Sequence, residues 1–198
     1  VLAPAKRLEQ MGFSVTRVQP DRNGFITVAA LEQVMRPETV LVSVMAANSE
    51  VGSVQPVAEL ARTAHAAGAL FHTDATQALG KVPVNVVDWG CDAASFSAHK
   101  VGGPKGVGAL YVKSRTPFDA FMLGGGQEAG RRSGTQNVCG VAGFAAAIQV
   151  VQEKQADEQA RLGALRDKLY AALAEKPGVR PTVQVDPGSQ DYLPNIVH

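Results

Sequence analysis

The chain has 198 residues, of which 45% are hydrophobic and 19% are charged, and its formal net charge is +1. A nearly balanced charge without blocks of like charge argues against nucleic-acid or anionic membrane partners, and no apolar run is long enough to span a bilayer. The two cysteines, Cys91 and Cys139, are too few for a disulfide framework, so a reducing, cytoplasmic location is expected.

Apolar runs alternate with helical patterns along the chain. Strands are predicted at 14–18, 39–45 (fully buried), 69–74, 92–98 and 106–112. Helices are predicted at 27–36 with Thr27 as N-cap, at 56–68, briefly after 74, and at about 138–175 as one helix or two. A further β-like segment is predicted after 181. The alternation predicts an α/β domain of three layers with a mainly parallel central sheet, in which 106–112 is an antiparallel or edge strand.

Polar side chains gather where three of these predicted strands end. In parallel sheets, ligands bind outside the carboxyl ends of the strands. The residues at these ends are Asn48, Ser49 and Glu50 after the first, His72, Asp74 and Gln77 at the second, and Ser97, His99 and Lys100 at the third. If 69–74 and 92–98 are neighbours, Asp74 and the group 97–100 converge on one crevice.

Each of these residues has an ordinary structural explanation when taken alone. Asp74 and Gln77 match a capping box for a following helix, and an isolated Lys100 is more simply a surface charge. His72, Asp74 and His99 are also nitrogen and oxygen donors of the kind that zinc or iron accepts, although no ligand pair has helical spacing. The sequence alone leaves these alternatives open.

Taken together, the residue types suit a site for pyridoxal phosphate. A lysine can hold the cofactor aldehyde as a Schiff base, and a carboxylate facing the pyridinium nitrogen keeps the ring protonated. Hydroxyls and a histidine can hold a phosphate. Asp74, Ser97, His99 and Lys100 supply these groups in a suitable order, and burial is expected to lower the pKa of Lys100.

Three blocks of sequence resemble the cysteine desulfurases, which belong to the class V aminotransferase branch of fold-type I pyridoxal-phosphate enzymes. The blocks are HTDATQALGKVPV (72–84), DAASFSAHKVGGPKGVGALYV (92–112) and GGGQEAGRRSGTQNV (124–138). The resemblance implies that Lys100 forms the Schiff base and that Asp74 pairs with the pyridine nitrogen. It also implies that Gln77 contacts the ring hydroxyl and that Ser97 and His99 hold the phosphate.

The resemblance implies two further cofactor-binding residues, and the sequence departs from the family pattern at two positions. Asn48 matches the first residue of the family's Asn-Asn-Glu-Ile/Val-Gly motif, but Ser49 replaces the second asparagine, so the contact that this side chain makes with the ring hydroxyl is expected to be lost or left to water. Thr135 is expected to reach the phosphate of the partner subunit's cofactor, which implies a homodimer. Ala129 stands where the family usually has arginine.

The implied activity is the conversion of L-cysteine to L-alanine. The sulfur is passed on as a persulfide for iron–sulfur cluster or thio-cofactor assembly, with sulfur-acceptor or scaffold proteins as partners of the intact enzyme. No metal site is expected, and Cys91 and Cys139 do not match the family's catalytic cysteine. The alternatives are a selenocysteine lyase or a class V aminotransferase, and a non-catalytic fragment.

The resemblance also implies a domain organisation. Residues 1–150 are expected to form the pyridoxal-phosphate-binding large domain, incomplete at its amino terminus. Residues 151–180 are expected to form a long helical connection, and 181–198 the start of a truncated small domain. Both ends of the chain are therefore expected to be cut, which would remove the substrate-binding arginine and the loop with the catalytic cysteine and leave the isolated chain inactive.

Overall fold

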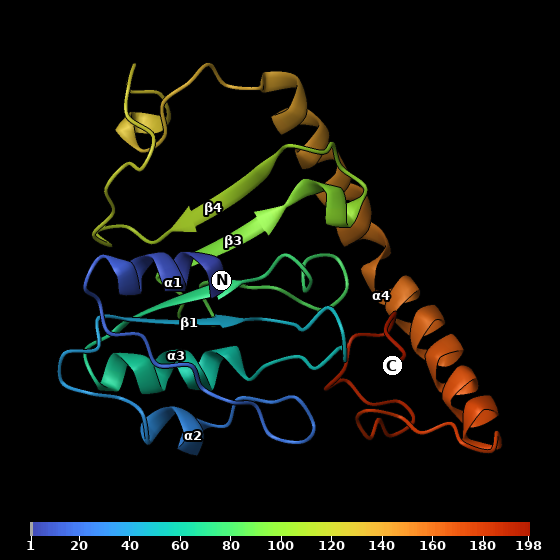
Figure 1. Cartoon of the computed structure of the whole chain (residues 1–198). Helices are drawn as coiled ribbons and strands as arrows, with labels where there is room; N and C mark the ends of the chain where they lie inside the picture. The colour runs from blue at the N-terminus through green and yellow to red at the C-terminus, as the bar shows by residue number, and fades with distance from the viewer. Residues whose placement is uncertain (1) are drawn as a thin grey trace.

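A single four-stranded sheet organises the chain, as the computed structural model of residues 2–198 shows (Figure 1). Its strands, in spatial order, are β1 (Leu41–Met45), β2 (Leu70–Asp74), β3 (Ala93–Ser97) and β4 (Gly108–Val112). The first three strands run parallel and β4 runs antiparallel to β3 at the edge. The mainly parallel sheet and its antiparallel edge strand are thus as predicted.

Helices are present within the predicted ranges 27–36, 56–68 and about 138–175, and one more helix, at 2–10, was not predicted. They are α1 (Leu2–Gln10), α2 (Val28–Glu32), α3 (Val57–Ala66) and α4 (Val138–Ala174), with short 3₁₀ turns η1 (Ala98–Val101) and η2 (Glu128–Gly130). Thr27 caps α2 as predicted, because its Oγ1 accepts a hydrogen bond from the Ala30 amide at 3.1 Å. The pattern at 138–175 is one continuous helix, which runs through Gly163. No described helix is both long and apolar enough to cross a membrane.

Three predicted elements are absent from residues 2–198. Segment 14–18 pairs with no strand, and after 181 the only β interaction is an isolated bridge between Ser53 and Tyr192. The helix expected after Asp74 is replaced by turns, in which the Asp74 carboxylate accepts a hydrogen bond from the Thr76 amide at 3.0 Å. A strand needs a hydrogen-bonded partner, which the local propensity of a segment cannot provide. The turn after Asp74 offers the backbone hydrogen bonds that compete with those of a helix.

The main core lies between α3 and one face of the sheet. Leu60 of α3 and Phe71 of β2 are fully buried there, with Val42 of β1 beside them. The strand predicted to be fully buried is buried on this side only, because Leu41 and Met45 on the opposite face are 52% and 40% exposed. The opposite face of the sheet therefore remains accessible over β1.

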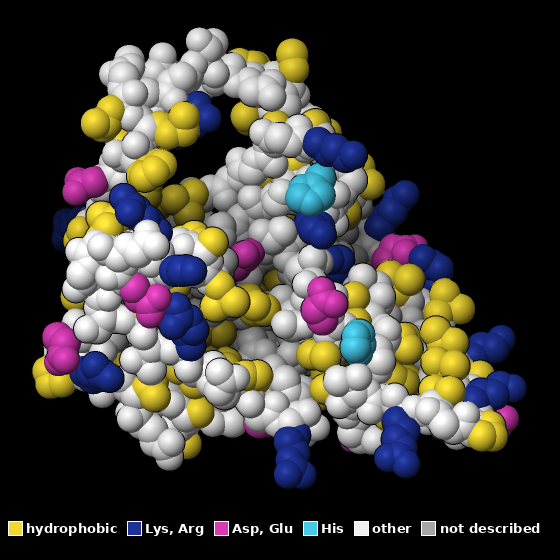
Figure 2. Space-filling view, in the orientation of Figure 1, with side chains coloured by type: hydrophobic (Ala, Val, Ile, Leu, Met, Phe, Trp, Pro, Cys, Tyr) yellow, Lys and Arg dark blue, Asp and Glu magenta, His cyan; other side chains and the backbone are white. Residues whose placement is uncertain are grey.

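Helix α4 packs against η1 and the end of β3. Phe144 and Ile148 contact a small cluster around Ala98 and Phe96. The segment between β4 and α4 extends beyond the sheet (Figure 1) and exposes apolar side chains, among them Phe121 at 98% and Leu123 at 85%. Hydrophobic side chains on this segment and along α4 are visible in Figure 2.

The carboxyl-terminal segment is hydrogen-bonded to α4 and packs into the core. The guanidinium of Arg166, which is 4% exposed, donates to the carbonyls of Tyr192 and Ser189 and pairs with the Asp167 carboxylate. Leu193 is fully buried in the main core, and its amide donates to the Gly52 carbonyl at 2.7 Å. The loop that follows β1 is thereby fixed by residues about 140 positions later in the chain.

Candidate functional site

The register of the parallel strands brings the predicted site residues to one edge of the sheet. Asp74 is the last residue of β2 and Ser97 is the last residue of β3, and η1 with Lys100 follows directly. The Ala75 amide donates to the carbonyl of Ser95 at 3.0 Å, which fixes the two strand ends side by side. The predicted convergence of Asp74 with segment 97–100 therefore has its structural basis in the β2–β3 pairing.

Asp74 is half-buried and keeps one carboxylate oxygen available. Its Oδ1 accepts the Thr76 amide, while Oδ2 makes no hydrogen bond within residues 2–198. The main chain around it is fixed from the other side as well, because the Ala46 amide donates to the Asp74 carbonyl at 2.8 Å. A charged oxygen on a rigid strand end is suited to pair with a cationic group.

A row of polar side chains crosses the accessible face of the sheet next to Asp74. His72 Nδ1 lies 2.8 Å from Ser43 Oγ on β1, and His72 Nε2 lies 3.2 Å from Ser95 Oγ on β3. Burial lowers the pKa of His72, and the nearby charge of Asp74 only partly opposes this effect. The two hydroxyls can satisfy both ring nitrogens of a neutral imidazole, so His72 is a neutral polar neighbour of the Asp74 carboxylate.

The end of β3 and η1 present a hydroxyl, an imidazole and an amine. Ser97 Oγ lies 2.7 Å from His99 Nδ1, and both His99 and Lys100 are exposed. The predicted burial of Lys100 is therefore wrong for the single chain, because Lys100 lies exposed in η1 beyond the end of β3. An accessible amine beside a hydroxyl–imidazole pair can receive an anionic ligand with an electrophilic carbon.

A side-chain contact beside this group was missed by the sequence reasoning. Lys81 Nζ donates to Gln77 Oε1 at 2.7 Å. Burial lowers the pKa of Lys81, and the positive charge of Lys100 lowers it further. The i,i+4 spacing of Gln77 and Lys81 was the available signal, but it indicates a side-chain contact only in a helix, and this segment forms turns.

The other two predicted cofactor-binding residues differ in position. Asn48 follows β1, and its Oδ1 accepts the amides of Glu50 and Val51 at 2.8 and 2.9 Å, so its acceptor shapes the loop. Ser49 is exposed in the same loop. Thr135 is exposed before α4 and makes no hydrogen bond to the strand-end group within the described part of the chain. The single chain thus brings together the other candidates but not Thr135.

The two cysteines differ in exposure, and neither matches the predicted catalytic residues. Cys91 is buried, and burial together with the Asp92 charge raises the pKa of its thiol to about 11, which makes it unreactive at neutral pH. Cys139 is exposed in the first turn of α4. Among residues 2–198, no group of three or more His, Cys, Asp or Glu side chains could hold a metal ion, so His72, Asp74 and His99 do not form such a group.

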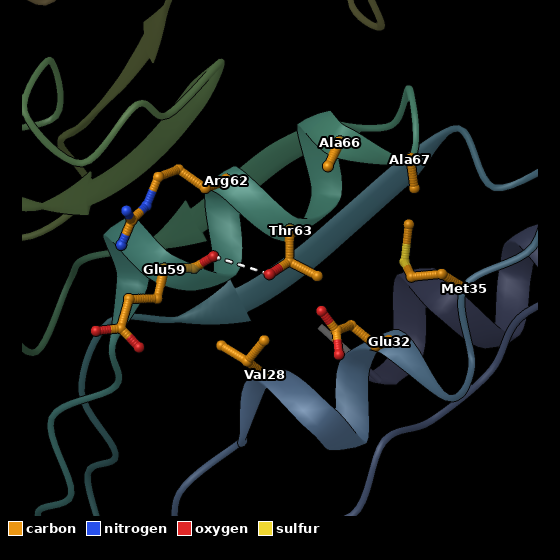
Figure 3. Close-up of a pocket in the computed structure, with 8 residues that line it drawn as sticks. All are labelled: Val28, Glu32, Met35, Glu59, Arg62, Thr63, Ala66 and Ala67. Carbon is orange, nitrogen blue, oxygen red and sulfur yellow. Dashed lines mark hydrogen bonds between the residues drawn. The ribbon is translucent and has the colours of Figure 1, made fainter.

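An open groove lies away from these residues, between α2 and α3 (Figure 3). Val28, Glu32 and Met35 line one side, and side chains of α3 and the residue after it line the other. None of the candidate site residues lines this groove. The chemistry-bearing groups instead occupy the carboxyl edge of the sheet.

The fold and this edge define an α/β domain with a lysine-containing, anion-compatible candidate site. The family model described as "Aminotransferase class-V" matches residues 1–193, and the chain belongs to that family. Curated relatives include cysteine desulfurase IscS of Glaesserella parasuis serovar 5 (strain SH0165), 45% identical over 86% of this chain and 42% of the relative. Cysteine desulfurase IscS of Anaeromyxobacter dehalogenans (strain 2CP-C) is 47% identical over 89% of this chain and 44% of the relative.

Two solved structures are similar to this chain over 98% of its residues. A NifS-like protein matches with a TM-score of 0.91 and 39% identity over 98% of this chain and 52% of that structure. DndA from Streptomyces lividans matches with a TM-score of 0.85 and 38% identity over 98% of this chain and 54% of that structure. The chain thus spans about half the length of the relatives it matches.

Proposed function

We propose that this chain is part of a pyridoxal-phosphate-dependent cysteine desulfurase. The proposed reaction breaks the Cβ–S bond of L-cysteine, transfers the sulfur to a protein thiol as a persulfide, and leaves L-alanine after protonation at Cβ. The acceptor would use the sulfur for iron–sulfur cluster or thio-cofactor assembly. The observation that carries the proposal is the placement of Asp74 and Lys100 at adjacent parallel strand ends, in a chain 45% identical to a cysteine desulfurase IscS.

The donor set at the sheet edge fits the cofactor. When bound, pyridoxal phosphate supplies an aldehyde that condenses with amines and a pyridinium ring that withdraws electrons from the substrate α-carbon. Asp74 would hold the proton on the ring nitrogen with its available carboxylate oxygen. Lys100 would bind the aldehyde carbon and move a proton at the substrate α-carbon.

The remaining candidates would orient the ring and phosphate. Ser97 and His99, which already lie 2.7 Å apart, would bind phosphate oxygens, and Gln77 would donate to the ring hydroxyl. Asn48 would support the loop beside the ring rather than offer its Oδ1, which two amides occupy. Thr135 would contact the phosphate of the cofactor bound to a second subunit.

A homodimer and a cytoplasmic location complete the proposal. The apolar side chains exposed on segment 118–123, such as Phe121 and Leu123, are of the kind that a subunit interface covers. Both cysteines are free thiols, which suits a reducing compartment. The division into 1–150, 151–180 and 181–198 stays a prediction.

Cysteine is the substrate that the comparisons favour. One matching solved structure is described as SspA in complex with cysteine, with 38% identity and a TM-score of 0.72 over 75% of this chain and 43% of that structure. A selenocysteine lyase, an amino-transferring class V enzyme and a non-catalytic fragment are the alternatives.

The decisive experiment adds pyridoxal phosphate to the purified protein and to its Lys100→Ala variant. A band at about 410–430 nm in the wild type only is expected, since it requires the lysine amine. Formation of alanine from cysteine, without amino transfer to a keto acid, would then separate the desulfurase from an aminotransferase. No band, or a band that persists in Lys100→Ala, would overturn the cofactor assignment.

A band without alanine formation would favour the non-catalytic alternative for whichever chain is tested. The 198-residue chain and the whole protein should therefore be assayed side by side. Alanine formation by the 198-residue chain above its Lys100→Ala control would contradict the prediction that this chain alone is inactive.

A further inference from the structure

Lys81 and Gln77 form a directed contact beside the candidate site. The ammonium of Lys81 donates to Gln77 Oε1 at 2.7 Å, and both side chains are half-buried. An ammonium group has donors only, so it selects the oxygen end of the amide. The amino end of Gln77, with its two N–H donors, is consequently directed away from Lys81.

The turn that holds this pair is anchored to the site and to α4. Gly80 has a left-handed φ of +74°, and a Cβ at this position would lie 3.2 Å from a methyl of Val101 in η1. The carbonyl of Val82 accepts a hydrogen bond from the Gln155 side chain of α4 at 2.7 Å. Lys81 therefore lies in a turn that is fixed on both sides and packed against η1, the element that contains Lys100.

Lys81 has no carboxylate partner in the described part of the chain, although it is partly shielded from solvent. Burial, and secondarily the charge of Lys100, lowers its pKa. Placing two ammonium groups near each other has a cost, which an anionic ligand bound beside both of them would offset.

We propose that Lys81 is a positioning residue for the cofactor: it locks the Gln77 amide so that its N–H donors face the ring hydroxyl oxygen of pyridoxal phosphate. That oxygen is an acceptor, and strongly so when it is ionised. Without Lys81, the Gln77 amide is free to rotate, and the orientation that presents its oxygen repels the ring oxygen. This inference rests on the proposed function, because it assumes that pyridoxal phosphate binds at this edge.

A purely structural role for Lys81 would have a different signature. If the lysine only tied the turn to Gln77, its loss would weaken every ligand at the site by a similar factor. If it positions the amide, its loss should matter only when both Gln77 and the ring hydroxyl are present. A cofactor analogue without the hydroxyl separates the two roles.

The experiment measures equilibrium affinity of the cofactor-free protein for pyridoxal 5′-phosphate and for 3-deoxypyridoxal 5′-phosphate. Lys81→Met is expected to weaken the first about 10-fold, the usual effect of a lost hydrogen bond to a charged group, and to change the second less than about 2-fold. Lys81→Arg, also a donor-only side chain, should restore most of the affinity. Lys105→Met removes an exposed lysine five residues after Lys100 and is the matched control, expected to change neither affinity.

A double-mutant cycle tests the same point independently. In a Gln77→Ala background, Lys81→Met should produce no further loss of pyridoxal phosphate affinity, because the two side chains act as one unit. Equal losses for both cofactors, or equal losses with and without Gln77, would overturn the inference while leaving the proposed function intact. A wild-type protein that takes up no pyridoxal phosphate would overturn both.

Unfolding of Lys81→Met would not prevent the test. Lys81→Gln keeps a polar side chain that is one atom shorter and can present either end of its amide to Gln77, so it should lose most of the preference for the hydroxyl-bearing cofactor. Thermal unfolding of each cofactor-free variant should be followed alongside, to confirm that affinities are compared among folded proteins. A Lys81→Gln protein with the wild-type ratio of the two affinities would contradict the inference.

Discussion

Asp74 lies directly opposite Ser95 in the parallel register of β2 and β3. Because β3 continues without a break into η1, this one pairing also determines where the Lys100 backbone lies relative to Asp74. A slip of one residue would turn Asp74 and His72 to the face covered by α3. The proposed site thus depends on sheet register more than on any single side chain.

Asp74→Asn should abolish most of the proposed activity without unfolding the protein. Asparagine has a similar shape and can still accept the Thr76 amide, but it carries no negative charge to keep a pyridinium nitrogen protonated. We expect alanine formation from cysteine to fall at least about 100-fold, since electrostatic groups of this kind contribute a few kcal/mol. Retention of a third or more of the wild-type rate would argue against this role for Asp74.

His72 predicts a pH dependence of stability. Its pKa is lowered in the folded protein by burial, so between that pKa and the ordinary value of about 6.5 the unfolded chain binds the extra proton. The free energy of unfolding contributed by His72 is therefore fully present above about pH 6.5 and decreases as the pH falls through the folded pKa.

Urea unfolding of the cofactor-free protein between about pH 7.5 and 5 measures this effect. His72→Asn should make the dependence shallower, because asparagine does not titrate and can still bond to the Ser43 hydroxyl. His99→Asn, which replaces an exposed histidine, should be measured alongside as the comparison variant. An unchanged slope in His72→Asn would show that the imidazole is not buried in its neutral form.

Asp92 fastens the opposite, amino-terminal edge of the sheet. Its carboxylate accepts the Phe71 amide at 2.8 Å and lies 2.7 Å from His65 Nε2, with Lys113 at 3.8 Å. Burial raises the pKa of Asp92, but the hydrogen bonds from His65 and Phe71 outweigh it, so the net pKa is lowered. Its stabilisation is therefore present above about pH 4 and lost as the pH falls through the folded pKa.

Asp92→Ala should destabilise the fold by about 2–3 kcal/mol at neutral pH, because the buried Phe71 amide would lose its acceptor. The loss should shrink in acid, because the stabilisation by Asp92 declines as the pH falls below its ordinary value of about 3.8 towards its lowered folded pKa. Chemical denaturation at pH 7 and pH 3 gives both values. An equal loss at the two pH values would show that the charge of Asp92 contributes nothing.

Arg166 is predicted to hold the carboxyl-terminal segment in place. Arg166→Met keeps much of the packing volume but leaves Asp167 Oδ1 and two carbonyls without their donor. Breaking a buried pair of this kind costs about 3 kcal/mol or more. Limited proteolysis should detect earlier cleavage around 188–192, and the neighbouring exposed Lys168→Met serves as a control with little expected effect.

The sequence was informative where a signal is local. The helical pattern at 56–68 predicted α3, and Thr27 predicted a helix start, because both depend on residues within a few helical turns. It was misleading where a strand needs a distant partner. Segment 14–18 has strand-like residues but pairs with no strand among residues 2–198, and Leu41 is apolar yet exposed.

By itself, the sequence determined the residue types at the carboxyl edge of the sheet, their order, and the family to which the chain belongs. Only the tertiary structure decided the hydroxyl–imidazole row through His72, the open position of Lys100 and the contact of Lys81 with Gln77. The reason is physical: strand register, burial and the direction of a hydrogen bond depend on segments that meet only after folding.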